Sequence, residues 1–290
     1  MSQVPNSLVA RLAPATFVLL WSTGFIGAKY GLPYAEPLTF LTLRMVFVVA
    51  AFLIIVAIAR PKWLTAREWL HSAVAGSLMH VTYLGGVFVA ISLGVPAGIS
   101  ALIPGLQPIL TATIANRFLG ERVTPLQWFG LVIGLVGVAL VLQDRHVMSG
   151  ATIAGWIATF ISLLGITLGS LYQKRYCSAI DWRAGNLAQY ITAAIVFGLG
   201  ALAFETRVVN WQPQFILALT WTVLVMSVAA IGLMYWLIRR MPAAQVASLF
   251  YLVPSVTALM AFALFNERLD TLAIVGMVIC AAAVFIVNKR

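Results

Sequence analysis

Two ionisable side chains lie inside long apolar stretches of this sequence. His80 occurs in GSLMHVTYLGG, and Arg44 follows Pro37 by seven residues, which is about 10 Å along a helix. His80 is compatible with a buried side chain hydrogen-bonded to a neighbour, or with a cavity-lining group that contacts a substrate or accepts a proton. Arg44 is equally compatible with extension to the membrane surface and with a two-pronged hydrogen bond to a carboxylate. Both are candidate binding residues, and their roles depend on the elements that carry them.

The composition indicates that those elements lie in a lipid bilayer. Apolar residues make up 62% of the 290 residues, charged residues only 9%, and the mean hydropathy is +1.00. A soluble domain of this size carries far more surface charge. Apolar runs long enough to cross a hydrocarbon core of about 30 Å recur along the whole chain. They predict an all-α membrane protein with ten transmembrane helices, at residues 12–30, 38–59, 69–93, 97–118, 126–142, 153–176, 185–204, 215–238, 243–265 and 272–287.

The net charge of +10 is explained by this topology. With the N-terminus in the cytoplasm, most of the 18 Lys and Arg residues fall on cytoplasmic helix ends and loops. This asymmetry follows the positive-inside rule and predicts that both termini are cytoplasmic. No nucleic-acid partner is therefore expected. Ten helices can enclose a cavity without a second subunit, so we expect a monomer.

The sequence contains an internal repeat. The segment PILTATIANRFLGER at 108–122 returns as PSVTALMAFALFNER at 254–268, and residues 96–142 align with 242–288 without a gap. Five spans per copy is an odd number, so the second copy must enter the membrane from the opposite side, as in many secondary carriers. We predict two inverted five-helix repeats, residues 1–147 and 148–290, around a central cavity. The matched Pro108 and Pro254 are the predicted hinges.

Positions that differ between the two copies are candidates to shape an asymmetric pocket. His80 and Tyr83 share one helix face, and the second copy has Met226 and Ala229 in their place. Tyr251 replaces a glycine of the first copy, and Trp21 lies deep in the first span. The predicted substrate-binding residues are His80, Tyr83, Tyr251, Arg44, Trp21 and Gln107.

The motifs resemble those of a known family. The repeated Pro-x-x-Thr-Ala…Glu-Arg pattern, the Gly-rich GLVIGLVGVALVL and the opening WSTGFIGAKYGLPYAEPLTFLTLRMVF are similar to the drug/metabolite transporter superfamily, specifically its EamA-type ten-helix carriers. The resemblance covers the whole chain, and within the family the chain looks most like the YddG-type aromatic amino-acid exporters. It implies export of small metabolites through a central cavity, without a cofactor.

The acidic residues argue against a carboxylate-coupled proton pump. All eight Asp and Glu residues lie near span ends, whereas proton-driven antiporters need a buried carboxylate. No metal site is expected, because Cys177 and Cys280 are far apart and the three His residues are scattered; a membrane enzyme is disfavoured on the same ground. We predict an inner-membrane facilitator or exchanger in a bacterium, which exports aromatic or large apolar amino acids by alternating access. The alternative is a broad-specificity multidrug or metabolite exporter coupled to protons.

Overall fold

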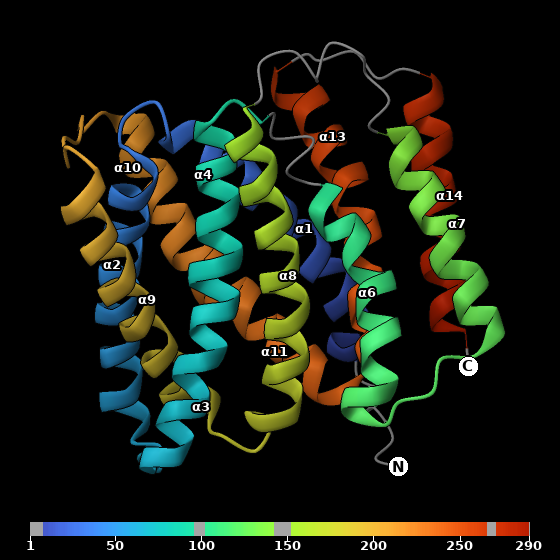
Figure 1. Cartoon of the computed structure of the whole chain (residues 1–290), viewed down its shortest axis with the longest axis horizontal. Helices are drawn as coiled ribbons and strands as arrows, with labels where there is room; N and C mark the ends of the chain where they lie inside the picture. The colour runs from blue at the N-terminus through green and yellow to red at the C-terminus, as the bar shows by residue number, and fades with distance from the viewer. Residues whose placement is uncertain (1–7, 96–101, 142–151, 266–270, 290) are drawn as a thin grey trace.

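The computed structural model describes residues 8–95, 102–141, 152–265 and 271–289, which form a bundle of helices (Figure 1). No strand occurs within these ranges, and one isolated antiparallel bridge joins Ala35 to Val209. The elements are α1 (Leu8–Gly31), α2 (Pro37–Ala59), α3 (Ala66–Gly76), the π-helical segment η1 (Ser77–Gly85), α4 (Gly86–Ser92), α6 (Leu102–Leu119), α7 (Pro125–Val141), α8 (Ile153–Tyr176), α9 (Trp182–Phe204), α10 (Pro213–Trp221), the π-helical segment η3 (Thr222–Ala230), α11 (Ile231–Arg240), α12 (Ala243–Ser248), the 3-10 segment η4 (Leu249–Tyr251), α13 (Leu252–Phe265) and α14 (Thr271–Asn288).

Several helices have the length and composition of membrane spans. Five of them are long and apolar enough to cross a bilayer: 37–59, 66–92, 153–176, 182–204 and 213–240. Shorter apolar helices cover 12–28, 106–115, 125–140, 243–257 and 274–288, and each of these segments overlaps a predicted span. Large apolar side chains are left exposed on the outer faces, and Phe204 is 83% exposed and Ile58 79%. Lipid tails cover such faces, so the predicted all-helical membrane protein is confirmed.

Helix ends are specified locally by the sequence. Thr65 and Glu68 form a capping box at the start of α3, where each side chain accepts a hydrogen bond from the other residue's backbone N–H. Pro37 and Pro213 occupy the first turn of α2 and α10, where a missing N–H leaves no unmade hydrogen bond. Gly120, which follows α6, has a φ of 71° and permits the chain to leave the helix in the left-handed conformation.

Helices at equivalent positions of the two halves pack against each other. α2 lies along α9, and α7 lies along α14, at opposite ends of the long axis of the bundle (Figure 1). The starts of α2 and α9 are 145 residues apart, and those of α7 and α14 are 146 apart. Glycines bring α7 and α14 close together: a Cβ built at Gly137 would lie 2.9 Å from the backbone nitrogen of Cys280.

The two halves share an irregularity as well. η1 begins at Ser77 and η3 at Thr222, again 145 residues apart, and both segments have nine residues. Long π-helical stretches are rare and occur mostly near functional sites. In each half, the π-helical segment continues into an α-helix that completes the same span, α4 in the first half and α11 in the second.

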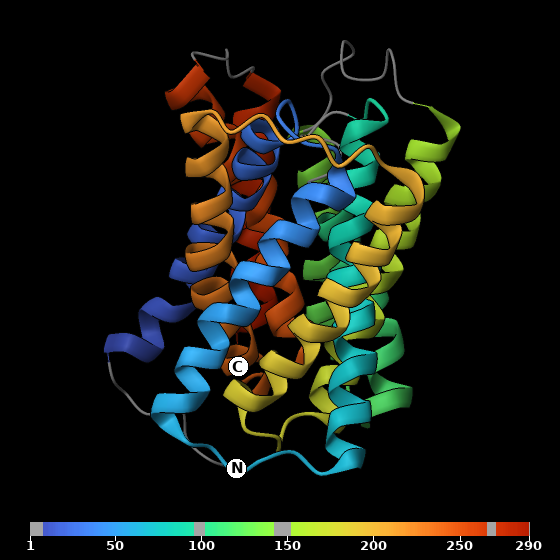
Figure 2. The same cartoon turned by 90° about the vertical axis from the view of Figure 1, so that its left-hand side faces the viewer.

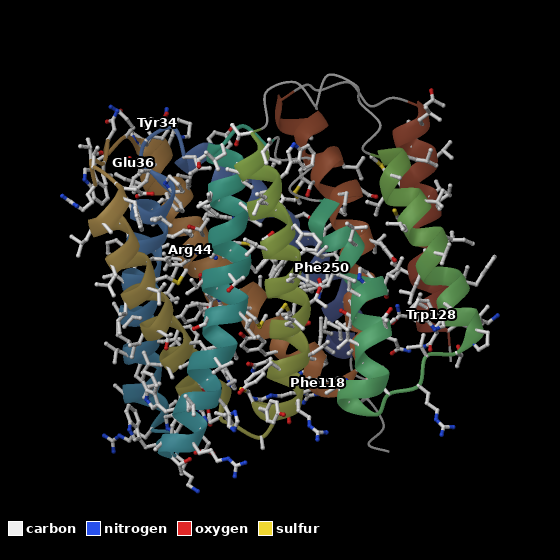
Figure 3. The ribbon with its side chains drawn as sticks, in the orientation of Figure 1. Tyr34, Glu36, Arg44, Phe118, Trp128 and Phe250 are labelled. Carbon is white, nitrogen blue, oxygen red and sulfur yellow. The ribbon has the colours of Figure 1, made fainter. Side chains whose placement is uncertain are left out.

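The bundle has two ends, which Figure 2 shows from the side. We call the end at which α1 begins and α14 ends the terminal end, and the opposite end the distal end. At the distal end, Glu205 accepts hydrogen bonds from the backbone nitrogens of Leu38 and Thr39, over 2.7 and 2.6 Å. Glu36 accepts in return from the backbone nitrogen of Thr206, over 2.7 Å. These bonds join the start of α2 to the end of α9. Arg44, also in α2, lies deeper in the bundle than Glu36 (Figure 3).

At the terminal end, Glu121 connects three helices. Its carboxylate accepts from the backbone nitrogen of Ala243, which begins α12, and forms an ion pair with Lys174 near the end of α8. Lys174 also donates to the carbonyl of Met241 over 2.6 Å. The repeat partner of Glu121, Glu267, lies outside the described residues. Both ends of the bundle are therefore held by carboxylates, and the residues of the candidate site lie between them.

Candidate substrate cavity

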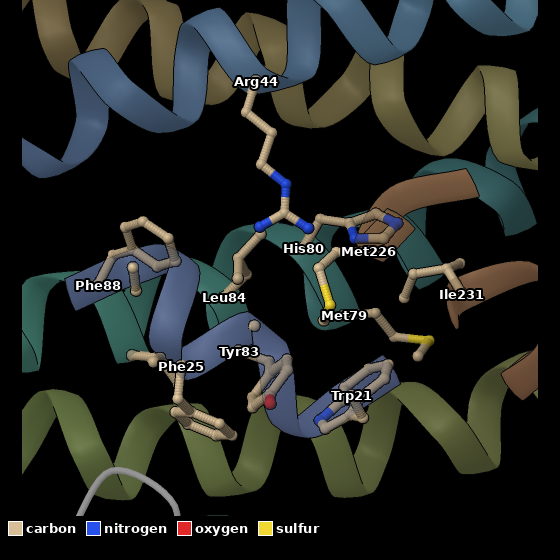
Figure 4. Close-up of a pocket in the computed structure, with 13 residues that line it drawn as sticks. Trp21, Phe25, Arg44, Met79, His80, Tyr83, Leu84, Phe88, Met226 and Ile231 are labelled. Carbon is tan, nitrogen blue, oxygen red and sulfur yellow. The ribbon is translucent and has the colours of Figure 1, made fainter. Parts of the chain in front are cut away.

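A cavity lies between α1, α2, the span that contains η1 and α4, and the span that contains η3 and α11 (Figure 4). The space between its lining atoms, including the part open to the outside, is about 500 Å³. We call it the substrate cavity. It is lined by Trp21, Gly24, Phe25, Ala28, Arg44, Met79, His80, Tyr83, Leu84, Val87, Phe88, Met226 and Ile231. Most of the wall is apolar or aromatic, and its two cation-forming side chains are Arg44 and His80.

Arg44 enters this cavity from α2, and its guanidinium points toward His80 (Figure 4). The residue is only 5% exposed. Its Nε donates to the Oγ of Ser227 over 3.1 Å, and none of the acidic side chains in the described ranges forms an ion pair with it. A buried guanidinium without a counter-ion is unfavourable in a medium of low dielectric constant. The side chain of Arg44 therefore faces the cavity and does not extend to the membrane surface.

His80 lies beside Arg44 and stacks on Tyr190 of α9. The ring centroids are 4.5 Å apart with an interplanar angle of 27°, and the hydroxyl of Tyr190 donates to the carbonyl of Ser227 over 2.6 Å. The Nε2 of His80 is buried and has no hydrogen-bond partner in the described part of the chain. Buried polar atoms are normally paired, so a cavity-lining nitrogen of this kind is available to a bound molecule.

Aromatic rings form the wall opposite Arg44. Trp21 of α1 stacks on Tyr83 of η1, with centroids 6.2 Å apart at 15°. On the side toward the terminal end, Trp21 contacts the edge of Phe250 at 5.3 Å, and Phe17 contacts Phe250 at 5.4 Å. Phe17, Trp21 and Phe250 thus form one cluster of buried rings, of which Trp21 lines the cavity.

The comparisons with known proteins identify the kind of molecule that has this cavity. The sequence matches the EamA-like transporter family over residues 12–143 and 152–289. The chain belongs to this family. It is thus a multi-pass membrane protein of the drug/metabolite transporter superfamily, and its family transports small molecules across membranes.

Its relatives carry the names of transporters, and the chain aligns with most of their length. The Bacillus subtilis transporter YvbV is 27% identical over 304 residues, which cover 100% of this chain and 94% of the relative. A probable amino-acid metabolite efflux pump of Escherichia coli is 26% identical, with coverage of 93% and 91%. A solved crystal structure has a TM-score of 0.79 at 18% identity and covers 96% of this chain and 95% of its own; it shows that the fold is shared.

Within this EamA-family chain, the structure brings four of the six predicted binding residues together. Trp21, Arg44, His80 and Tyr83 all line the substrate cavity. Gln107 lies elsewhere, on α6, where its Nε2 donates to Ser170 of α8 over 3.4 Å and its buried Oε1 has no partner among the described residues.

Tyr251 also lies away from the cavity. Its ring packs against Gly134 of α7, and its hydroxyl donates to the carbonyl of Leu131 over 2.6 Å. The substitution of a glycine by Tyr251 thus adds a contact between helices rather than a wall of the cavity. Neither Gln107 nor Tyr251 lines the substrate cavity.

Several lining residues were absent from the sequence prediction, among them Phe25, Met79, Phe88 and Met226. Phe25 could have been found because it follows Trp21 by four residues on one helix face. Met79 and Phe88 could not, since the π-helical segment between Ser77 and Gly85 changes which side chains share a face.

The predicted hinges occupy different backbone settings. Pro108 is buried within α6, and Pro254 is buried in the first turn of α13, directly after the 3-10 segment Leu249–Tyr251. The helical geometry thus changes from 3-10 to α just before Pro254, whose ring nitrogen has no N–H to donate. Among the described residues, no group of His, Cys, Asp or Glu side chains is suited to hold a metal ion.

Proposed function

We propose that this protein is an inner-membrane exporter, acting as a facilitator or exchanger, of amino acids with aromatic or large apolar side chains. The observation that carries the proposal is Arg44, a buried cation without an acidic partner among the described residues, which faces an aromatic cavity. A substrate carboxylate would supply the missing negative charge through a charge-assisted, two-pronged hydrogen bond. The name of the Escherichia coli relative, a probable amino-acid metabolite efflux pump, supports an amino-acid substrate.

The other residues that line the cavity suit the side chain and the amino group of such a substrate. Trp21, Phe25, Tyr83 and Phe88 offer ring faces and edges to an aromatic or branched side chain. His80 offers a nitrogen that can hydrogen-bond the carboxylate or the amino group. Binding sites for small molecules commonly combine a mostly apolar wall with a few polar groups that fix orientation.

The absence of an acidic side chain from the cavity wall favours transport without proton coupling. None of the lining residues is Asp or Glu. A proton-driven exporter of organic cations exchanges its substrate for protons at a buried carboxylate, and it gains nothing from a buried arginine. The alternative, a broad-specificity multidrug or metabolite exporter coupled to protons, is therefore disfavoured.

For the transport cycle we propose ten transmembrane helices in two inverted repeats, residues 1–147 and 148–290, with both termini cytoplasmic. The offsets of 145 and 146 residues between α2 and α9, between η1 and η3, and between α7 and α14 support the repeat. The halves would rock about Pro108 and Pro254 and expose the cavity to each side in turn. A monomer is sufficient for this mechanism, because the cavity is enclosed by helices of one chain.

The test is competition for phenylalanine transport in liposomes that contain the purified protein. Labelled phenylalanine is preloaded, and efflux is measured with an excess of phenylalanine, 3-phenylpropionate or phenethylamine outside. We expect phenylalanine and 3-phenylpropionate to stimulate or inhibit the efflux, because each carries a carboxylate that pairs with Arg44. Phenethylamine lacks a carboxylate and should have no effect. Preferential transport of phenethylamine or other organic cations, driven by a pH gradient, would replace this proposal by the multidrug alternative.

A further inference from the structure

A second polar pocket lies at the terminal end of the bundle, between α8, α9 and α11. The side chains of Gln173, Asn186 and Gln189 supply three amides to its wall, and Tyr235, Arg239 and Asp181 add a phenol and two charges. We call it the amide pocket. All three amide side chains are at most 4% exposed, and the space between the lining atoms is about 160 Å³. In this conformation the pocket is too narrow to admit a water molecule, and its wall is more polar than that of the substrate cavity.

One amide oxygen of the amide pocket, that of Asn186, has no hydrogen-bond partner among the described residues, whereas the amide oxygens of Gln173 and Gln189 are already paired. The Nδ2 of Asn186 donates to the carbonyl of Trp182 over 2.8 Å, and this bond fixes the amide while its buried Oδ1 lacks a partner among the described residues. The Oγ of Ser72 is also buried without a partner there, and it lies against Gly185, which lines the pocket. Unpaired buried oxygens cost free energy unless a donor reaches them, so the Oδ1 of Asn186 is available to a hydrogen-bond donor of a bound group.

Opposite charges lie at the rim of the amide pocket. Arg239 is exposed and is oriented by the carbonyls of Cys177 and Ile180, which accept from its Nη2. Asp181 begins α9, and its carboxylate is paired with Arg183. A ligand with one carboxylate and one ammonium group matches this set, with the carboxylate at Arg239 and the ammonium at the amide oxygens.

The amide pocket corresponds to the substrate cavity under the repeat. The cavity is lined by α1, α2 and α4, and an offset of 145 residues maps these onto α8, α9 and α11. The same offset maps Ala28 onto Gln173 and Arg44 onto Gln189, and all four residues line their respective pockets. In an inverted repeat, the pocket that is open in one half becomes closed when the halves exchange conformations.

Only one layer of side chains separates the two sites. The hydroxyl of Tyr235 donates to the Oε1 of Gln189 over 2.7 Å and lies 3.4 Å from the sulfur of Met79, which lines the substrate cavity. The Nε2 of Gln189 donates in turn to the Oε1 of Gln173 over 3.1 Å. A movement that separates Tyr235 from Gln189 would free these polar groups for a ligand and would join the amide pocket to the cavity.

We propose that the amide pocket is a second binding site, which recognises the ammonium and carboxylate groups of an amino acid at the terminal end when the protein adopts the opposite conformation. This inference rests on the proposed function and refines it. The substrate cavity selects the carboxylate through Arg44, and the amide pocket adds selection for the ammonium group. An amino acid therefore satisfies both sites, and a carboxylate without an amine satisfies only one.

Labelling of the native Cys177 thiol can reveal when the amide pocket opens, because Cys177 lines this pocket and is 1% exposed. Burial raises the pKa of its thiol to about 12, which keeps it poorly reactive while the pocket is closed. Cys280 lies in the contact between α7 and α14, so Cys280→Ala gives a single-cysteine background. The full chain in liposomes is treated from the terminal end with a membrane-impermeant maleimide, and the labelling rate of Cys177 is measured.

We expect Cys177 to be labelled without substrate, whenever the empty protein opens to the terminal end, and to be protected by phenylalanine, by about tenfold at a concentration of ten times the dissociation constant. 3-Phenylpropionate, which lacks the ammonium group, should protect it much less. Asn186→Leu should abolish the difference between the two ligands, and Asn186→Asp, which keeps an acceptor oxygen, should retain it. Since Asn186→Asp tests the same position with a polar side chain, misfolding of the leucine variant does not decide the outcome.

Two results would overturn the second site. One is a thiol that stays unreactive in every condition, because the pocket then never opens to the terminal end. The other is equal protection by phenylalanine and 3-phenylpropionate, because the thiol is then hidden by a change of conformation without recognition of the ammonium group. In both cases transport that depends on Arg44 can remain intact and is measured separately, so failure of the second site is distinguished from failure of the proposed function.

Discussion

The Nε of Arg44 in α2 donates a hydrogen bond of 3.1 Å to the Oγ of Ser227 in η3. The same serine donates from its Oγ to the carbonyl of Thr222 over 3.1 Å, and its own carbonyl accepts from Tyr190 of α9. Ser227 of the π-helical segment η3 thus holds two side chains in place. One is Arg44, and the other is Tyr190, on which His80 stacks. The remaining guanidinium nitrogens of Arg44 are left to the cavity, as Figure 4 shows.

Replacement of Arg44 by glutamine removes the charge that we assign to substrate carboxylates. Arg44→Gln should raise the KM for phenylalanine by about ten- to a hundredfold, the loss expected for a charge-assisted hydrogen bond in a buried site. The matched control is Arg67→Gln, because Arg67 is an exposed arginine at the start of α3. The measurement is initial efflux from liposomes over a range of phenylalanine concentrations. An unchanged KM in Arg44→Gln would refute the assignment.

His80 contributes a hydrogen bond in the cavity and an aromatic contact to Tyr190. His80→Phe keeps the contact and loses the hydrogen bond, so we expect a KM about three- to tenfold higher, which corresponds to roughly 1 kcal/mol, with unchanged expression and thermal stability. His80→Ala loses both interactions and should lower the melting temperature as well. If both variants transport as well as the native chain, His80 has no role in binding.

Transport should be indifferent to a pH gradient. None of the described residues that line the cavity is Asp or Glu, so they offer no carboxylate to exchange a proton for a substrate. Phenylalanine efflux is measured with and without an imposed gradient, in the native chain and in His80→Ala. Efflux that occurs only with the gradient, and that is lost in His80→Ala, would identify His80 as a proton site and contradict the facilitator.

Tyr251 should affect stability and not substrate affinity. Tyr251→Phe removes the hydrogen bond to the Leu131 carbonyl and should lower the free energy of unfolding by about 0.6 to 1.7 kcal/mol, the range for hydrogen bonds between membrane helices. Gly134→Ala should destabilise the protein more, because a Cβ there would lie 2.4 Å from a ring atom of Tyr251. Both are measured by thermal unfolding in detergent, and the KM for phenylalanine is the control. A large rise in KM for Tyr251→Phe would restore Tyr251 to the substrate path.

The distal end should lose stability in acid. Hydrogen bonds from Thr206 hold the pKa of Glu36 below its ordinary value of 4.5. The stabilisation is therefore present above the ordinary pKa and is lost as the pH falls through the lowered one. We expect Glu36→Gln to be less stable than the native chain at neutral pH, and the difference in melting temperature to shrink below about pH 4. A difference that does not change with pH would mean that the charge of Glu36 is not involved.

The sequence by itself determined much of the architecture. Long apolar runs must lie in lipid as helices, because backbone groups have no other partners there, and this sets the positions of the spans. The positions of Arg44 and His80 within such runs marked them as candidates for the interior, since a charged or polar side chain is costly against lipid, but the sequence left open whether Arg44 extends to the membrane surface. Both residues line the substrate cavity, together with the predicted Trp21 and Tyr83.

Only the tertiary structure decided which other side chains share the cavity. Tyr251 and Gln107 lie on helices that are apolar on all sides, so hydrophobic periodicity does not reveal which face points inward. The rotation of these helices is set by contacts with distant segments, such as the packing of Tyr251 on Gly134. The π-helical segments likewise change the phase of the spans that carry His80 and Met226, and the sequence pattern assumes regular α-helix. The amide pocket arises for the same reason, because Gln173, Asn186 and Tyr235 come from three helices that meet only in the folded chain.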